Sequence, residues 1–430
     1  MKKVAIGGGQ GFWGDSPDAA IHMIRNADIQ YMGCDYLAEL TLSIMAKQQL
    51  KDPTKGFAPD FTTRILKEAG KEAWDKHIKI CTNAGGMNIN GCVDGIRQWA
   101  EGNSMSGYKI GYVTGDNIKD KIYNCNVYIG HEGIEGCLAE GADVVITGRA
   151  ADSALFLAPL KYEFGWAADD WDNLARGIMA GHLLECGGQG AGGNYMYDWR
   201  NVPRMDELGF PIAELTDDTF EITKAPDCGG IICEQSCKEQ FLYEVHDPAN
   251  YLTPDVNVDI SHATITQVGD NRVRIGGVKG KPRPDTLKLC VGYHKGWKTV
   301  SMLSFAWPDA YEKAQYCAEI IMKKMQRRGM KADDIHISYI GLNSLHLGVA
   351  DMSEEALKNL NECVLRIAVF SEDKSECAKI IPEISPMQLN GPPGASFFGG
   401  RARVQEVMAL WPTTVPRDAV QVESHILEVK

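Results

Sequence analysis

The stretch KKVAIGGGQGFWGDSPDAAIHMIRN, residues 2–26, decides the fold. It begins with an apolar run that predicts a strand, continues through a glycine-rich loop and ends in a segment that predicts a helix. A glycine-rich loop between a strand and a helix often lets backbone N–H groups approach an anion. Counted from Gly7, the dinucleotide pattern G-x-G-x-x-G meets Phe12 where it requires its last glycine, and no Gly-Lys-Ser or Gly-Lys-Thr follows. The stretch therefore predicts a strand–loop–helix unit, but it does not name the ligand.

The same unit recurs through the first 160 residues. Four further apolar segments predict strands, and most of them are followed by a helical segment: residues 29–36, 77–86, 107–117 and 142–152. Strands and helices that alternate at this spacing predict a parallel sheet with helical crossovers. Because only five or six units precede a change of pattern, we expect an open, doubly wound (Rossmann-like) sheet rather than a (β/α)8 barrel.

In the rest of the chain, the pattern of predicted strands, helices and loops changes twice. Residues 165–283 combine glycine-rich loops with a predicted hairpin at 262–277, and residues 284–430 alternate short strands with a long helix at 310–328. We therefore expect a parallel α/β domain at 1–164, a connecting region at 165–283, and a second, α+β domain with a mainly antiparallel sheet at 284–430.

Composition excludes several classes of protein. The net charge of −13 over 430 residues argues against a sequence-independent nucleic-acid surface, which needs clustered Lys and Arg. No apolar run approaches the roughly 18 residues of a membrane span, and the predicted first strand leaves no room for a signal peptide. Thirteen scattered cysteines in such a chain indicate a reducing compartment. We expect a cytoplasmic protein with reduced cysteines that binds neither nucleic acid nor a membrane.

All five predicted strands end in polar side chains beside glycine or another small residue. Ligands of open parallel sheets bind beyond the carboxyl ends of the strands, so we expect residues 7–14, 82–88 and 147–149 to border one pocket. The candidate catalytic residues are acids and amides: Asp35, Glu39, Asn83, Asn88 and Asp116. The candidate substrate-binding residues are Gly8, Gly9, Gly11, Asp15, Ser16, Gly85, Gly86, Thr147, Gly148, Arg149, Asp152 and, from a second glycine-rich loop late in the chain, Asn390.

These residue types suit an acidic substrate and proton transfer. Glycine loops and Arg149 favour a carboxylate or phosphate, while the acids favour proton transfer or a hard cation such as Mg²⁺. We expect Asp35 or Asp116 to act as the base, and Asn83 or Asn88 to donate to a developing oxyanion. Asp35 and Asp116 are also the expected ligands if a metal is bound. For any one acid alone, a helix cap or an ordinary ion pair is the simpler explanation.

Other residues with reactive side chains give weaker signals. His131 and His182 are candidates for acid–base chemistry, and Cys186 lies between a predicted helix and a glycine loop, although an inert buried thiol is the simpler interpretation. The spacing of Cys228, Cys233 and Cys237 fits neither zinc sites nor common iron–sulfur sites. We expect these three cysteines to be structural and free of metal.

The chain resembles one known family over nearly its whole length, from Val4 to at least Arg403. The segments that carry the resemblance stand in order: GGGQGFWGDSPDAA, CDYLAELTLSIMAKQ, TNAGGMN, ADVVITGRAADSALFLAPL, GHLLECGGQ, EVHDPANYLTPDV, KGKPRPDTLKL and NGPPG. They are similar to the AtuA family of acyclic terpene utilisation. The resemblance implies a context of acyl-CoA and branched-acid catabolism. It also implies a small ferredoxin-like domain or separate partner protein, which we expect this chain to need as a partner. The resemblance supplies no catalytic residues.

Together these observations favour an enzyme of carboxylic-acid or acyl-CoA catabolism. We expect a lyase that adds or removes water from a hydroxy or unsaturated acid or its CoA ester, and an oligomeric protein. No cofactor is certain; Mg²⁺ and a CoA-ester substrate are the candidates. Two alternatives stay open: a metal-dependent hydrolase or isomerase that uses the same acids, and a non-catalytic subunit that binds an acyl group or CoA for a larger complex.

Overall fold

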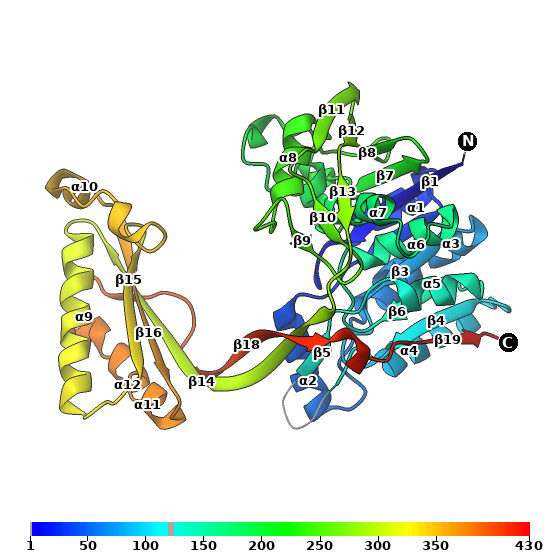
Figure 1. The fold of residues 1–430 in the computed structure, drawn as a ribbon. Coiled ribbons are helices and arrows are strands. Elements are labelled where there is room, and N and C mark those ends of the chain that lie inside the picture. Colours follow the sequence, from blue (N-terminus) through cyan, green and yellow to red (C-terminus); the bar gives the residue numbers. More distant parts are fainter. Residues whose placement is uncertain (1, 119–123) are drawn as a thin grey trace. The chain divides into compact units, whose positions relative to one another are not determined.

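The computed structural model describes residues 2–118 and 124–430, which divide into two compact units (Figure 1). The first unit spans Met1–Gly292 and Leu410–Lys430, and the second unit spans Tyr293–Ala409. The units divide the chain at other places than 1–164, 165–283 and 284–430. Those three ranges stay a prediction about domains.

The first unit is built on a ten-stranded sheet with the order β11-β12-β8-β7-β1-β2-β3-β6-β4-β19. Its five central strands pair in parallel and are the five predicted ones: β1 (Lys3–Gln10), β2 (Tyr31–Cys34), β3 (Lys79–Thr82), β6 (Val144–Thr147) and β4 (Lys109–Thr114). Antiparallel strands extend it on both sides: β7 (Pro211–Thr216), β8 (Phe220–Lys224), β12 (Arg272–Gly276) and β11 (Thr264–Gly269) beyond β1, and β19 (Glu423–Glu428) beyond β4. The fold is therefore mixed α/β, and a Rossmann-like winding stays a prediction.

Successive side chains of the parallel strands enter two different apolar cores. Val4 and Ile6 belong to one core and Ala5 to the other, as the alternation of a strand requires. The first core is covered by α5 (Glu132–Ala139), α6 (Ala154–Phe164), α7 (Trp171–Leu184) and α8 (Glu234–Leu242). The second is covered by α1 (Asp18–Asn26), α2 (Glu39–Lys51), the π-helix η1 (Phe61–Gly70), α3 (Lys71–Asp75) and α4 (Ile89–Gly102). Because both faces are buried, these strands read as almost continuous apolar runs.

Smaller elements complete the first unit. A three-stranded sheet has the order β13 (Lys279–Lys281), β10 (Asn257–Asp259), β9 (Tyr251–Leu252). The strand β5 (Asn124–Val127) pairs with the first residues of β14 (Thr286–Ala306). Short 3-10 turns are η2 (Gly187–Ala191), η3 (Trp199–Asn201), η4 (Met205–Glu207) and η6 (Arg417–Ala419). The predicted hairpin is confirmed as β11 and β12.

The second unit contains an antiparallel sheet, as predicted. Its order is β15 (Asp334–Ile340), β16 (Glu362–Ser371), β14 and β17 (Ser396–Phe397), and β18 (Val404–Pro416) also pairs with β14. The predicted long helix is α9 (Ala310–Arg327), which packs on β16. Short helices complete the unit: η5 (Leu347–Val349), α10 (Glu354–Lys358), α11 (Lys374–Ala378), α12 (Ile381–Ile384) and α13 (Met387–Asn390). Short strands were predicted for this part of the chain, but β14 is one strand of 21 residues that begins in the first unit and continues in the second.

Two general properties follow from the described residues. None of their helices combines the length and apolar character needed to cross a membrane. All thirteen cysteines are free thiols.

Candidate functional site

A cavity of about 1660 Å³ lies in the first unit, and residues that follow β1, β2 and β6 line it. Its volume exceeds the usual 300–1,000 Å³ of a small-molecule pocket. Six of the residues proposed from sequence line it: Gly11, Asp15, Ser16, Asp35, Glu39 and Asp152.

Asp35 follows the last residue of β2 and presents a buried carboxyl group to this cavity. Its Oδ1 accepts hydrogen bonds from the side-chain amide of Asn83 at 2.5 Å and from the backbone N–H of Leu37 at 3.0 Å. Burial raises the pKa of Asp35 to about 6, against the charge of Arg149 and these two hydrogen bonds, which lower it. The carboxyl group can therefore both accept and release a proton near neutral pH.

Asn83 contacts the carboxyl group of Asp35 and does not line the large cavity. It follows β3, the neighbour of β2, and it is fully buried. Its Oδ1 accepts a hydrogen bond from the backbone N–H of Tyr36 at 2.7 Å while its amide donates to Asp35. Asn83 thus orients the carboxyl group, and the expected role as an oxyanion donor has no support from its position.

Arg149 is buried, with 1% of its surface exposed, and it does not line the cavity. One guanidinium nitrogen, Nη2, donates to Oδ1 of Asp152 at 2.6 Å, and Nη1 donates to the carbonyl of Leu37. The guanidinium group also stacks 3.9 Å from the ring centre of Tyr128. Arg149 is therefore absent from the lining, and its charge acts on the carboxyl groups of Asp35 and Asp152. Burial raises the pKa of Asp152, although Arg149 opposes this effect.

Glu39 also lines the cavity and is held there as an anion. The hydroxyl of Tyr128 donates to its Oε1 at 2.5 Å, and Nζ of Lys288 donates to the same oxygen at 2.8 Å. Burial alone would raise the pKa of Glu39, but the hydrogen bonds from Lys288 and Tyr128 outweigh burial and lower it to about 2. At neutral pH, Glu39 is a fixed negative charge rather than a proton carrier.

Glu185 adds a third acid to the group formed by Asp35 and Asp152. It follows α7, lines the cavity, and accepts from Nδ1 of the buried His182 at 2.9 Å. The other ring nitrogen of His182, Nε2, is buried without a hydrogen-bond partner. Cys186 lines the cavity next to Glu185, and burial raises the pKa of its thiol. This cysteine therefore stays protonated and is a poor nucleophile.

A second, smaller cavity of about 340 Å³ is lined by three more of the proposed residues. Gly86, Asn88 and Asp116 line it. The single pocket expected for residues 7–14, 82–88 and 147–149 is therefore wrong: the first loop borders the large cavity, and the second borders the small one. Burial raises the pKa of Asp116, whose Oδ2 accepts from the backbone N–H of Arg149 and from Asn126, both at 2.8 Å.

Asn88 has a local structural role at this second cavity. Its Oδ1 caps α4 by accepting from the backbone N–H of Gly91 at 3.0 Å. Its amide donates to the carbonyls of Pro53 and Lys55. These contacts occupy the side chain and are typical of a helix N-cap.

The glycines that open the sequence serve close packing. Gly8 and Gly9 lie inside β1, where a Cβ on Gly8 would stand 2.6 Å from the carbonyl oxygen of Leu184 and one on Gly9 would stand 2.6 Å from Sγ of Cys34. Only Gly11 reaches the cavity. The loop that follows is closed by Asp15, whose Oδ2 accepts from the backbone N–H of Gly11 at 3.0 Å. No anion cradle is needed to explain the glycines of β1.

The remaining proposed residues lie outside both cavities. A Cβ on Gly85 would stand 2.6 Å from the carbonyl of Thr147, and one on Gly148 would stand 2.5 Å from Asp116, so both glycines permit close approach. Thr147 is buried in β6. Asn390 belongs to the second unit and lines neither cavity.

Several lining residues escaped the sequence interpretation. Tyr128, Glu185 and Lys288 supply contacts described above, and Tyr251 lines the same cavity. All four residues stand away from the carboxyl ends of the five parallel strands, from which the site residues were predicted. For Tyr251, the quoted segment EVHDPANYLTPDV was the available signal, because a polar, proline-containing segment with little regular structure often borders a site.

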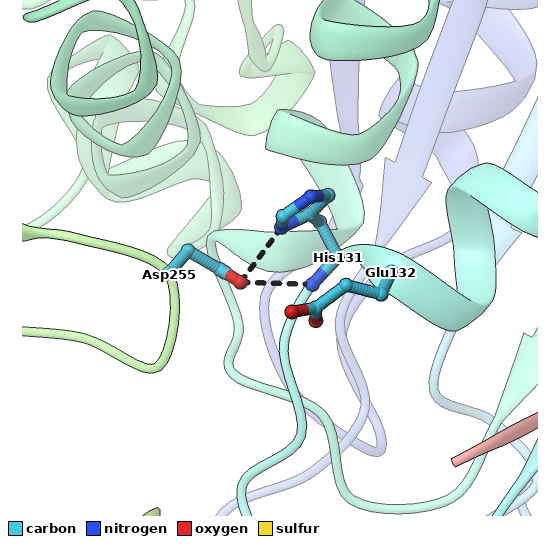
Figure 2. A group of neighbouring side chains, drawn as sticks. All are labelled: His131, Glu132 and Asp255. Carbon is cyan, nitrogen blue, oxygen red and sulfur yellow. Dashed lines mark hydrogen bonds and ion pairs between the residues drawn. The ribbon is translucent and has the colours of Figure 1, made fainter. Parts of the chain in front are cut away.

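Asp35 and Asp116 do not share a metal site. Asp35 faces the large cavity and Asp116 the small one. Within the described residues, one group of three possible metal-binding side chains has ligand atoms within 4.8 Å of one another: His131, Glu132 and Asp255 (Figure 2). Burial would lower the pKa of His131, but the charge and hydrogen bond of Asp255 raise it to about 10.

A family model described as acyclic terpene utilisation family protein AtuA matches residues 4–125 and 117–426. This match covers nearly the whole chain and both compact units. No curated protein and no solved structure is similar enough to count as a match.

Proposed function

Because the chain belongs to the acyclic terpene utilisation family AtuA, we propose that it is an enzyme of carboxylic-acid or acyl catabolism. Its reaction is the addition of water to an unsaturated acid or the removal of water from a hydroxy acid, and Asp35 moves the proton. One observation carries this proposal. Asp35 is an enclosed carboxyl group that lines a large cavity and has a pKa raised to about 6 by burial. A group with this pKa has both protonation states available at working pH.

The neighbours of Asp35 suit a single mobile proton. Asp35, Asp152 and Glu185 line the same cavity, and the charge of Arg149 lowers the pKa of Asp35 and of Asp152. Like charges in a buried group oppose simultaneous ionisation. In the proposed reaction, Asp35 takes a proton from the carbon next to the acid group, and one of the neighbouring carboxyl groups returns a proton to the departing hydroxide.

The charge of the residues that line the cavity restricts the classes of substrate that can bind there. Among the described residues, eleven Asp and Glu residues line the cavity against two Lys and Arg residues, Lys288 and Arg204. The ammonium of Lys288 already pairs with Glu39, so the lining suits at most a single carboxylate or a neutral ester. The several phosphate charges of CoA meet no such set of cations in the lining. We therefore favour a free acid or a compact ester, and a CoA ester only if its nucleotide part stays outside the cavity.

The test uses exchange with deuterated water, because it needs no knowledge of the product. Candidate hydroxy and unsaturated branched acids, with their CoA esters, are incubated with the full chain in D₂O and examined by mass spectrometry. We expect deuterium at the carbon next to the acid group with the wild type and none with Asp35→Asn. Asp116→Asn is the matched control, because Asp116 is an equally buried acid that faces the small cavity.

Two outcomes would contradict the proposal. Exchange by Asp35→Asn at the wild-type rate would remove Asp35 from the mechanism. Tight binding of an acid by the wild type with no exchange or turnover would favour the alternative of a binding subunit.

A further inference from the structure

We propose that His131, Glu132 and Asp255 bind one divalent transition-metal ion, such as Zn²⁺ or Mn²⁺, at the start of α5. Their ligand atoms lie within 4.8 Å of one another (Figure 2). The site is distinct from the acids of the large cavity, because none of the three residues lines that cavity.

Two segments far apart in the sequence bring these side chains together. His131 and Glu132 are the N-cap and first residue of α5, whereas Asp255 lies between β9 and β10. Oδ1 of Asp255 lies 2.8 Å from Nδ1 of His131 and accepts from the backbone N–H of the same residue at 3.1 Å. The imidazole is therefore already oriented toward the carboxylate.

Among the residues that the structure describes, none donates a hydrogen bond to the second carboxylate oxygen of Asp255. Oδ2 is buried, and none of its side chain is exposed. A buried carboxylate oxygen without a donor is costly and calls for a counter-ion or water. An ion that Asp255 binds through both carboxylate oxygens supplies this missing partner.

Gly130 leaves the space that the two carboxylates share. A Cβ at this position would stand 2.0 Å from Oδ1 of Asp255 and 2.9 Å from Oε2 of Glu132. Both oxygens thus converge on the same point beside the backbone. Any larger residue would push them apart and fill the cradle.

The donor set selects the kind of ion. One imidazole nitrogen and two carboxylate oxygens suit Zn²⁺ or Mn²⁺ better than Mg²⁺ or Ca²⁺, which prefer oxygen alone. The neighbouring charged side chains are already paired without the ion. Arg283 pairs with Oε1 of Glu132, and Lys161 pairs with Glu135. The carboxylate of Glu135 lies 3.4 Å from Nε2 of His131. The ion replaces the proton that His131 shares with Asp255, and water completes its coordination.

The proposed ion would fasten one wall of the large cavity. Thr253 and Pro254, directly before Asp255, line that cavity. Tying Asp255 to α5 therefore fixes the backbone next to the lining. This inference does not depend on the reaction proposed above.

The test measures binding of the metal alone. The full chain is stripped with a chelator and dialysed against ZnCl₂ or MnCl₂, and bound ion is counted by elemental analysis. We expect one ion per chain for the wild type, tighter binding of Zn²⁺ than of Mn²⁺, and a loss of at least about tenfold in affinity for Glu132→Gln and Asp255→Asn. Glu140→Gln is the matched control, because Glu140 is an exposed acid at the C-terminal end of α5, outside the ligand set and its contacts; the affinity of this variant should stay within about threefold of the wild type.

Binding at cysteines is a separate outcome and is recognised by Co²⁺. An ion held by nitrogen and oxygen lacks the strong near-ultraviolet absorption of a thiolate–Co²⁺ bond. The proposal fails if the wild type holds no ion at about 1 mM, if Glu132→Gln and Asp255→Asn bind as well as the wild type, or if the thiolate absorption appears. Should Asp255→Asn not fold, Glu132→Gln decides the question, because the Glu132 side chain is 46% exposed and tolerates the change.

Discussion

The carboxyl group of Asp35 is enclosed where water cannot solvate its charge, yet it faces the large cavity and accepts two hydrogen bonds. Its pKa in the folded protein, about 6, lies above the ordinary value of 3.8. The folded state therefore binds the proton more tightly than the unfolded chain does. The raised pKa that would let Asp35 transfer protons near neutral pH also lowers the free energy of unfolding once the carboxyl group ionises.

We expect Asp35→Asn to be more stable than the wild type at alkaline pH. Wild-type stability falls as the pH rises from about 4 to about 6, because folding then holds an ionised group in a place that favours the neutral form. The difference between 3.8 and about 6 corresponds to about 3 kcal/mol. Urea unfolding of both proteins at pH 4 and pH 8 measures it: the gap should reach up to about 3 kcal/mol at pH 8 and vanish near pH 4. Equal stabilities at pH 8 would show that Asp35 has an ordinary pKa.

Asn83 provides a second prediction at the scale of one residue. Asn83→Ala removes the hydrogen bond that favours ionised Asp35, so the pKa of Asp35 rises further. The acid limb of the pH–activity profile should move to higher pH, and stability should fall by about 1–3 kcal/mol, because the N–H of Tyr36 loses its acceptor.

Asn88→Ala is the matched control for this change. Asn88 caps α4, so its loss should cost about 0.5–2 kcal/mol and leave the acid limb in place. An acid limb that moves equally in both variants would mean that the shift comes from general loosening rather than from Asp35.

Among the elements, periodicity and strand ends predicted the parallel core well. The five parallel strands, the hairpin and α9 stand where apolar runs and turn residues place them, because each is a local pattern. The order of the strands in the sheet could not be predicted from the sequence. β6 lies between β3 and β4, and β19, which is far from β4 in the sequence, pairs with β4. Such pairings depend on long-range contacts that no local pattern records.

The candidate site was predicted only in part for the same reason. Asp35 and Asp152 follow parallel strands, and the rule about strand ends finds them. Glu185, Tyr128 and Lys288 come from a helix end, a segment after β5 and the start of β14. Arg149 and Asn83 follow strands too, but their side chains turn inward, and strand position alone cannot distinguish a lining residue from a supporting one.

The glycines of β1 give a prediction at the scale of an element. Gly8→Ala should destabilise the protein by about 1–3 kcal/mol, because its Cβ would press on the backbone carbonyl of Leu184 at the end of α7. Gly102→Ala is the matched control. Gly102 ends α4 with no atom within 4 Å of its Cβ position, so the change should leave stability equal or raise it by up to about 1 kcal/mol. Thermal unfolding compares them, and an unaffected Gly8→Ala would refute the packing explanation.

The charge of the whole molecule has a kinetic consequence. The net charge of −13 and the acidic lining both repel an anionic substrate. We expect kcat/KM for an acid substrate to rise between about 20 and 200 mM salt, because salt screens this repulsion. A neutral ester of the same acid serves as the control and should respond little. A fall of kcat/KM for the acid would point to an attractive cationic site.

At the same scale, we propose a small ferredoxin-like partner protein that adds to the edge of the ten-stranded sheet. β19 is the last strand in the order, and uncovered strand edges are commonly protected. Co-expression of the full chain with the small protein encoded beside it should give a complex that is stable in gel filtration, with activity above that of the chain alone. Full activity of the chain alone, with no complex, would rule this partner out.

The pairing of β19 with β4 also determines how late during translation the ten-stranded sheet can be completed. Thr114 and His425, which touch across these strands, stand 311 positions apart. A ribosome that adds about 5–20 residues per second needs roughly 15 to 60 seconds to cover that distance. During this interval the nascent chain exposes the open edge of β4, and Thr414, which lines the large cavity, has not yet been made. A growing chain therefore completes the lining of the large cavity only after residue 414 has been made, and a message cut before that codon would yield a protein in which the edge of β4 is unpaired and the cavity lacks part of its lining.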